Sequence, residues 1–210
     1  SASVAFVLML GLATPSPAMP WHWGVRAGVS AANFGGEFGE VVKPDLRLGL
    51  NGGFVLEGGL APGWSLHTGA AYASKGGESV SEGTDPFGNP TGLFNGKWVY
   101  DYVEIPVLIR ADLMRSARVV PFLEIGPAIG LLLKGRFESG FAGASDVDLK
   151  SDLKAIDFGV AAGAGVRFAA GPAKLGVEAR YSRGLSDAFD LDGNAETINQ
   201  AWTFAVSWMR

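Results

Sequence analysis

Apolar and polar residues alternate with a period of two along most of the chain from Trp21 onward. The stretch 101–112, DYVEIPVLIRAD, places Val103, Ile105, Val107 and Ile109 on one face and Glu104, Pro106, Leu108, Arg110 and Asp112 on the other. Successive side chains of a β-strand point to opposite faces, so this alternation predicts strands rather than helices. The same pattern recurs over residues 22–31, 46–57, 64–75, 119–134, 156–168, 174–183 and 201–209.

The eight predicted strands are longer than the roughly five or six residues usual in soluble sheets, and their length suits a tilted strand that crosses a bilayer. Their connections alternate between long and short. The long ones cover about 35–45, 76–97, 135–154 and 184–199, and the short ones 61–63, 115–118 and 170–173. This pattern predicts an all-β fold, an eight-stranded antiparallel up-and-down transmembrane β-barrel with both termini at the periplasmic end.

The polar face of the predicted strands identifies the inside of the barrel. A soluble barrel would expose that face to water, but here it consists mostly of small residues with scattered charges of both signs, Lys75, Lys134 and Lys174 among them. Charges of both signs can neutralise one another in a confined lumen. We therefore expect a lumen charge network formed by Arg26, Arg47, Glu57, Glu104, Arg110, Asp112, Glu124, Asp157, Arg167, Glu178 and Arg180.

Aromatic residues lie near the strand ends on the apolar face. Such residues form girdles at the two interfaces of outer-membrane barrels. The expected girdle comprises Trp23, Trp64, Tyr72, Phe168, Tyr181, Trp202 and Trp208.

Several motifs follow one another in an order that resembles the PorT-type outer-membrane β-barrel proteins of Bacteroidota-like bacteria. They are GVRAGVSAANF (24–34), YASKG (72–76), DYVEIPVLIRAD (101–112), PFLEIGPAIG (121–130), DFGVAAGAGVRF (157–168) and EARYSRGLSD (178–187). The resemblance implies an eight-stranded barrel inserted from the periplasm, and it implies no substrate. The chain departs from the usual aromatic end of such barrels, because it ends Trp208-Met209-Arg210. Trp208 is the candidate for the aromatic insertion signal, and the sequence leaves that role open.

The first twenty residues, SASVAFVLMLGLATPSPAMP, differ from the rest. An apolar run of about ten residues, too short to span a bilayer, precedes the small-residue segment that ends at Ala18, as in a secretory leader. We expect a signal peptide over 1–18 and an outer-membrane barrel domain over 19–210. The chain has 31 glycines and no cysteine, which suits a turn-rich barrel and excludes disulfides and zinc–thiolate sites.

Candidate catalytic residues are few. The two histidines, His22 and His67, belong to no recognisable Ser/His or Asp/His motif, so no enzyme is expected. The long connections carry fourteen acids and five bases, which argues against nucleic-acid binding and fits a solvated surface. Within them, DLDGNAE offers oxygen ligands to Ca²⁺ at Asp190, Asp192, Asn194 and Glu196.

The sequence thus predicts a monomeric, non-enzymatic protein of the Gram-negative outer membrane that needs no cofactor. We expect a scaffold or surface-binding protein, in contact with outer-membrane lipid and with a surface protein or lipid headgroup. The alternatives are a narrow, porin-like channel for ions or small solutes and a secreted soluble ligand-binding barrel. Two local expectations concern the stretch 101–112: Glu104 should pair with a basic lumen residue, and Pro106 should cause a bulge or a lost ladder bond.

Overall fold

The structure is a computed structural model that describes residues 20–37, 44–84, 90–114, 118–140, 145–188 and 197–210, with the backbone alone for 81–84 and 90–94. The expected leader over 1–18 and the candidate calcium ligands Asp190, Asp192, Asn194 and Glu196 lie outside the described residues. Among the described residues, no helix is both long and apolar enough to span a bilayer.

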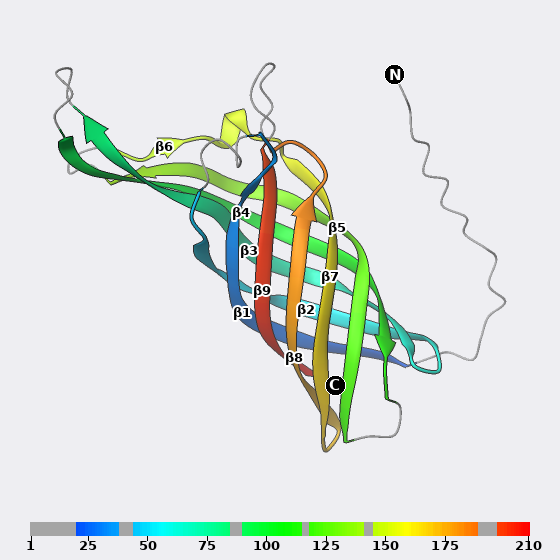
Figure 1. The fold of residues 1–210 in the computed structure, drawn as a ribbon. Helices are drawn as coiled ribbons and strands as arrows, with labels where there is room; N and C mark the ends of the chain where they lie inside the picture. Colours follow the sequence, from blue (N-terminus) through cyan, green and yellow to red (C-terminus); the bar gives the residue numbers. More distant parts are fainter. Residues whose placement is uncertain (1–19, 38–43, 85–89, 115–117, 141–144, 189–196) are drawn as a thin grey trace.

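Eight long antiparallel strands close into a barrel (Figure 1). They are β1 (Trp21–Gly35), β2 (Arg47–Ala61), β3 (Trp64–Thr84), β4 (Pro90–Asp112), β5 (Val119–Ser139), β7 (Ile156–Ala170), β8 (Ala173–Gly184) and β9 (Ile198–Met209). The two-residue strand β6 (Val147–Asp148) and the short 3₁₀ helix η1 (Lys150–Asp152) lie between β5 and β7. The long strands pair with their neighbours in sequence, and β9 pairs with β1, which closes the barrel. The predicted fold class is confirmed.

The alternation of the sequence sets the two faces of the wall. Leu48, Leu50 and Phe54 of β2 are exposed on the outside, whereas Glu57 on the same strand is buried in the lumen. An apolar outer surface of this kind is the arrangement of a membrane barrel and the reverse of a soluble one.

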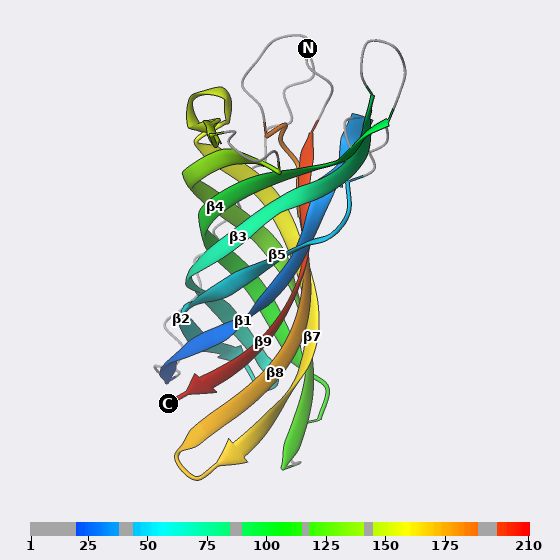
Figure 2. The same ribbon diagram turned by 90° about the vertical axis from the view of Figure 1, so that its left-hand side faces the viewer.

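Tight turns join the strands at one end of the barrel. The β2–β3 turn contains Gly63 and the β7–β8 turn contains Gly171, both with positive φ. Trp23 and Arg210 exchange backbone hydrogen bonds of 3.0 and 2.8 Å at this end, so the start of β1 and the end of β9 lie together there (Figure 2). In outer-membrane barrels the short-turn end is periplasmic.

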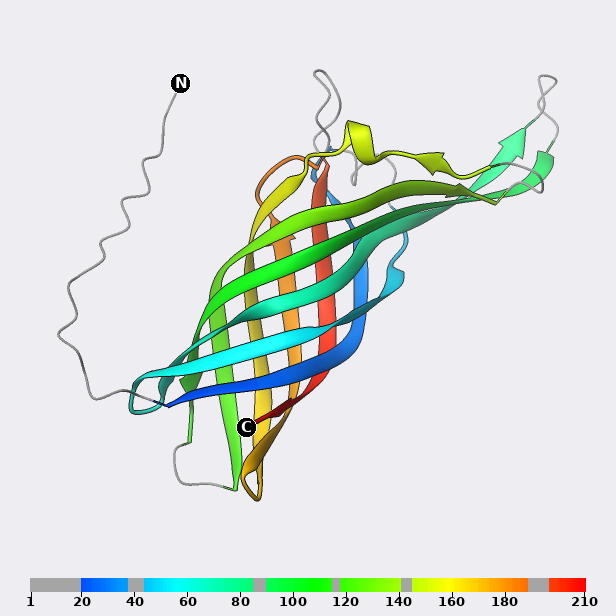
Figure 3. The same ribbon diagram turned by 180° about the vertical axis from the view of Figure 1, so that it is seen from behind.

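Strands β3, β4 and β5 continue well beyond the barrel at the opposite end (Figures 1 and 3). Pairing between β2 and β3 stops at Asn51↔Ala73, and β5 pairs with β7 only up to Leu131↔Ile156. We call the part of this extension from Gly76 outward, residues 76–84, 90–99 and 136–139, the wing. Residues 76–97 and 135–154 were expected in connections, but 76–84 and 90–97 belong to β3 and β4, and 135–139 belong to β5. The β3 part of the wing is rich in Gly, Ser and Glu, and its ladder with β4 supplies the order that an apolar face would otherwise give.

One local expectation needs correction, and another is met in one of its two forms. Lys134 was expected in the lumen but is exposed, because a bulge opposite Asp101 and Tyr102 adds one residue to β5 and reverses its alternation. Pro106 causes no bulge, since the β3–β4 register is the same on both sides of it. The ladder instead lacks residue pairs with β3 at Ile105 and Pro106, and Thr68 Oγ1 donates a hydrogen bond of 2.7 Å to the Pro106 carbonyl.

Candidate functional site: the lumen ion-pair network

Charged side chains from seven of the eight long strands meet inside the described barrel. The middle of the network is Arg110 on β4. Its guanidinium donates to Glu57 Oε2 at 2.9 Å and to Glu124 Oε2 at 2.8 Å, and its Nη2 lies 3.4 Å from Glu178 Oε2. Its Cζ atom lies 4.0 Å from the centre of the Phe122 ring. One arginine therefore joins the acids of β2, β5 and β8 across the lumen.

Two further arginines complete this central layer. Arg180 donates from Nε to Glu124 Oε1 at 2.9 Å and from Nη2 to Glu178 Oε1 at 3.1 Å. Arg26 Nη2 lies 3.1 Å from the same Glu178 oxygen. The side chains of Glu124 and Glu178 are at most 4% exposed, so their charges are balanced by these arginines rather than by water.

The periplasmic side of the network is built around Arg167. Its Nη1 donates to Glu57 Oε1 at 2.6 Å and its Nη2 donates to Asp112. Lys174 Nζ lies 3.9 Å from Glu57. Glu57 thus connects this layer to Arg110 in the middle of the barrel.

The outer side of the network contains Lys75 and Glu104, whose Nζ and Oε1 atoms are 2.6 Å apart. Lys75 is therefore the basic partner that the sequence left open for Glu104. Asp157 is held by Asn199 Nδ2 at 3.1 Å and by the Ser186 hydroxyl at 3.2 Å.

An apolar cluster lies beyond this layer, towards the wing. We call it the cap, and its buried members are Phe34, Tyr100, Tyr102, Leu132, Leu153 and Ala188. Asn199 donates to the Tyr102 hydroxyl at 3.1 Å, which links the cap to the charged layer. The outer mouth of the barrel is thus filled by side chains of β1, β4 and β5 and of the segments that follow η1 and β8.

The structure brings together ten of the eleven residues expected in the network and places one apart. Arg47 donates to Ser74 Oγ and to the Lys75 carbonyl, where β2 separates from β3. Sequence reasoning did not include His67, Lys75 or Asn199 among the site residues. His67 and Lys75 follow the alternation of their predicted strands, which was the available signal, whereas Asn199 lay in a predicted connection.

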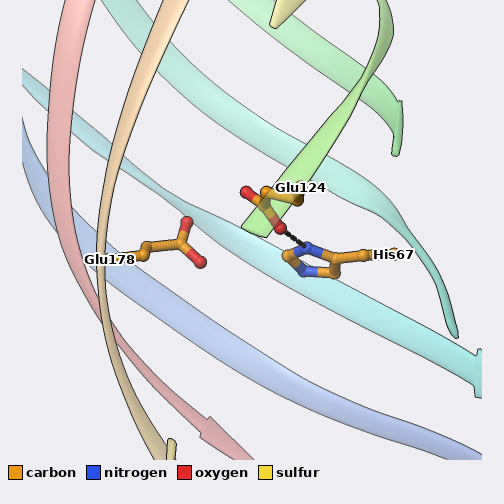
Figure 4. A group of neighbouring side chains, drawn as sticks. All are labelled: His67, Glu124 and Glu178. Atoms are coloured by element: carbon orange, nitrogen blue, oxygen red, sulfur yellow. Dashed lines mark hydrogen bonds and ion pairs between the residues drawn. The ribbon is translucent and has the colours of Figure 1, made fainter. Parts of the chain in front are cut away.

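His67, Glu124 and Glu178 form a cluster that resembles a metal site (Figure 4). Their potential ligand atoms lie within 4.8 Å of one another, and His67 Nδ1 is 2.9 Å from Glu124 Oε2. Arg110 Nη2 lies 2.6 Å from His67 Nδ1 and 2.8 Å from Glu124 Oε2. The cation held by these residues is therefore the guanidinium of Arg110, and we assign no metal to them.

The expected girdle residues lie on the outer surface in two groups. Trp23, Trp64, Phe168 and Trp208 are near the short-turn end, and Tyr72, Tyr181 and Trp202 are nearer the wing. The Trp23 and Trp208 rings meet edge to face at 5.8 Å, and the Tyr181 and Trp202 rings are 5.1 Å apart. Trp21, which the sequence reasoning missed, is 61% exposed at the short-turn end.

Three solved structures resemble this chain at low sequence identity. Neisserial surface protein A, from Neisseria, is 13% identical, with 88% of this chain and 95% of that chain covered and a TM-score of 0.46. Ail of Yersinia pestis is 15% identical, with 91% and 100% covered and a TM-score of 0.43. OprG of Pseudomonas aeruginosa is 10% identical, with 92% and 97% covered and a TM-score of 0.44.

Comparison of the sequence with curated proteins gave no match. The family model described as outer membrane protein beta-barrel domain matches residues 14–190, which is most of the chain. The closed eight-stranded wall and its apolar outer face agree with this match. The chain therefore belongs to the outer membrane protein beta-barrel domain family and is a protein of the Gram-negative outer membrane.

Proposed function

We propose that the protein is a non-enzymatic, closed barrel that anchors a binding surface, the wing and the neighbouring connections, at the outside of the outer membrane. The observation that carries this proposal is the lumen network. Arg110 contacts acids on three strands, and each of these acids has a second basic partner. Matched charges in successive layers are expected of a plug, whereas a pore would expose an unmatched charge along its axis.

The packing of the lumen supports the same proposal. The cavity beside Lys75, Glu104 and Asp157 has a volume of about 10 Å³, close to the minimum that holds one water molecule. The cap covers the outer side of this layer. The narrow channel, which is the alternative function, would need a continuous water path through both.

The environment of His67 supports a non-enzymatic role. The residue is 2% exposed, and its Nδ1 atom is close to Glu124 and Arg110 rather than to a nucleophile. A general base must reach the proton that it removes from a substrate. A substrate would have to displace the central arginine to reach this histidine.

Single-channel recording in planar bilayers tests the closed lumen. We expect no steady current steps from the wild-type protein, because the ion pairs fill the cross-section. The double variant Arg110→Ala/Glu124→Ala removes one charge of each sign and should open a path that conducts. Heat-modifiable gel migration checks that both proteins are folded. Steady steps from the folded wild-type protein would overturn the plug and favour the channel.

The finer assignments belong to the same proposal. The order of the EIP, GP and DFG segments on β4, β5 and β7 supports the PorT type within the family. Export through a leader over 1–18 predicts that protein purified from outer membranes begins near Met19. The proposed partners are outer-membrane lipid and a surface protein, with the barrel as a monomer.

A further inference from the structure

A cavity of about 330 Å³ lies in the wall where β2 separates from β3. Its lining combines two arginines with polar and apolar side chains. It consists of Val29, Arg47, Leu48, Gly49, Leu50, Tyr72, Ser74, Asp101 and Arg136.

The cavity exists because the β2–β3 ladder ends at Asn51↔Ala73, below the wing. Arg47 fills part of the gap, and its Nη1 donates to Ser74 Oγ at 3.1 Å and to the Lys75 carbonyl at 3.0 Å. These two bonds hold the guanidinium in place. Among the described residues they engage Nη1 alone, which leaves the N–H groups of Nε and Nη2 for a ligand.

A second guanidinium, that of Arg136, lines the same cavity beside Asp101. Arg136 Nη1 is 3.9 Å from Asp101 Oδ2, and its Nε donates to Glu138 at 2.7 Å. Asp101 Oδ1 accepts a hydrogen bond of 2.7 Å from the Ser74 hydroxyl. The carboxylate is thus near Arg136 directly and is connected to Arg47 through the Ser74 hydroxyl. The remaining donors of the two arginines can bind an added anion.

Strand register places the cavity at the outer membrane interface. Leu48 pairs with Ala31, Ala31 pairs with Trp202, and Trp202 pairs with Tyr181. Register thus connects Leu48 to the outer aromatic residues, and Tyr72, another of them, lines the cavity itself. Such aromatic residues lie near lipid headgroups in outer-membrane barrels. Arg47 lies one residue further out, while Val29 and Leu50, respectively 48% and 69% exposed, lie on the hydrocarbon side.

We propose that this cavity binds one phosphorylated lipid of the outer leaflet. The phosphate accepts hydrogen bonds from Arg47 and Arg136, and an acyl chain lies on Val29, Leu48 and Leu50. In such a site the hydrogen-bond donors lie on the outer side and the apolar surface lies on the hydrocarbon side. A lipid places its headgroup and its acyl chain in the same order. It is separate from the lumen and does not depend on whether the lumen conducts.

Lipid retention tests the site. Protein folded in dodecyl maltoside micelles is titrated with bisphosphorylated lipid A, and the bound complex is measured by native mass spectrometry. We expect Arg47→Gln/Arg136→Gln to lower the affinity at least tenfold, since two charge-assisted hydrogen-bond donors are lost. Arg118→Gln, which removes an exposed arginine from the periplasmic end, should leave the affinity within twofold of wild type.

Two competitors identify the source of the phosphate. Dephosphorylated lipid A should bind at least tenfold more weakly, and inorganic phosphate at the same concentration should not displace lipid A. Three results would each overturn the proposal. They are wild-type affinity for lipid A in the folded double variant, equal affinity for dephosphorylated and phosphorylated lipid A, and displacement of lipid A by inorganic phosphate. If the double variant does not fold, the single variant Arg136→Gln replaces it. The Arg136 side chain is 38% exposed, so its replacement should leave folding intact and still lower the affinity for lipid A.

Discussion

Glu124 shows how a single residue can hold the barrel interior together. Its side chain is fully buried, one carboxylate oxygen is 2.8 Å from Arg110, and the other is 2.7 Å from Arg180. A buried charge of this kind contributes little net stability as a pair, because desolvation offsets the attraction. Removing one partner is costly, because the opposite charges then stay buried without compensation.

Replacing Glu124 should therefore destabilise the protein strongly. We expect Glu124→Gln to lower the free energy of unfolding by about 3–5 kcal/mol, measured by urea titration in detergent micelles. Glu78→Gln is the matched control, because Glu78 pairs with Lys97 at 3.3 Å with both side chains at least 35% exposed. It should cost less than about 1 kcal/mol. Similar losses in both variants would contradict a buried network.

Most residues of the lumen network could be predicted from the sequence, but the ion pairs that they form could not. Alternation alone assigned Arg26, Glu57, Arg110 and Glu178 to the lumen. It could not choose their partners, because Arg110 and Glu57 are 53 positions apart and meet only once the barrel closes. Lys134 shows the limit of alternation, since one bulge reverses the facing of every residue after it.

Among the strands, β3 changes from barrel wall to wing near Gly76. This glycine has φ of 127°, a conformation that L-residues with side chains rarely adopt. A Cβ at this position would also collide with the carbonyl oxygen of Trp98 on β4. The strand can therefore bend here only if no side chain is present.

A pair of glycine substitutions separates crowding from backbone strain. Gly171, with φ of 63°, lies in the β7–β8 turn, and no atom lies within 4 Å of the place that a Cβ would occupy, so Gly171→Ala should cost about 1 kcal/mol. Gly76→Ala should cost at least about 1 kcal/mol more, because strain and the clash with Trp98 add. Urea unfolding of both variants gives the comparison. Equal losses would show that β3 can shift to accept the methyl group.

In the molecule as a whole, the barrel and the wing have separate roles in the proposed function. The barrel is closed by its own ladders from β1 to β9, and the wing continues the same sheet through β3, β4 and β5 with β6. Glu78 and Lys97 are register partners across β3 and β4, so the hairpin can be shortened there without changing the barrel ladder.

Shortening the wing should remove surface binding and leave the anchor. We expect a variant in which an Asn-Gly turn replaces residues 79–96 to keep heat-modifiable migration, with unfolding free energy within about 1 kcal/mol of wild type, since a two-residue turn suits a hairpin. Cells that display the wild-type protein are expected to adhere to host or bacterial surfaces. Cells that display the shortened variant should lose this adhesion. Loss of the folded gel species would show instead that the wing is needed for barrel folding.

The pattern along the chain was enough to establish the fold class, the number of long strands, their inward and outward faces and the short-turn end. These properties depend on a two-residue period and on turn composition, which are local features that the chain carries without reference to contacts. Only the folded barrel shows which charges pair, where β5 bulges, how far β3 and β4 continue and where β2 leaves β3. Each of these depends on strand register around a closed barrel, and register is fixed only when distant segments pair.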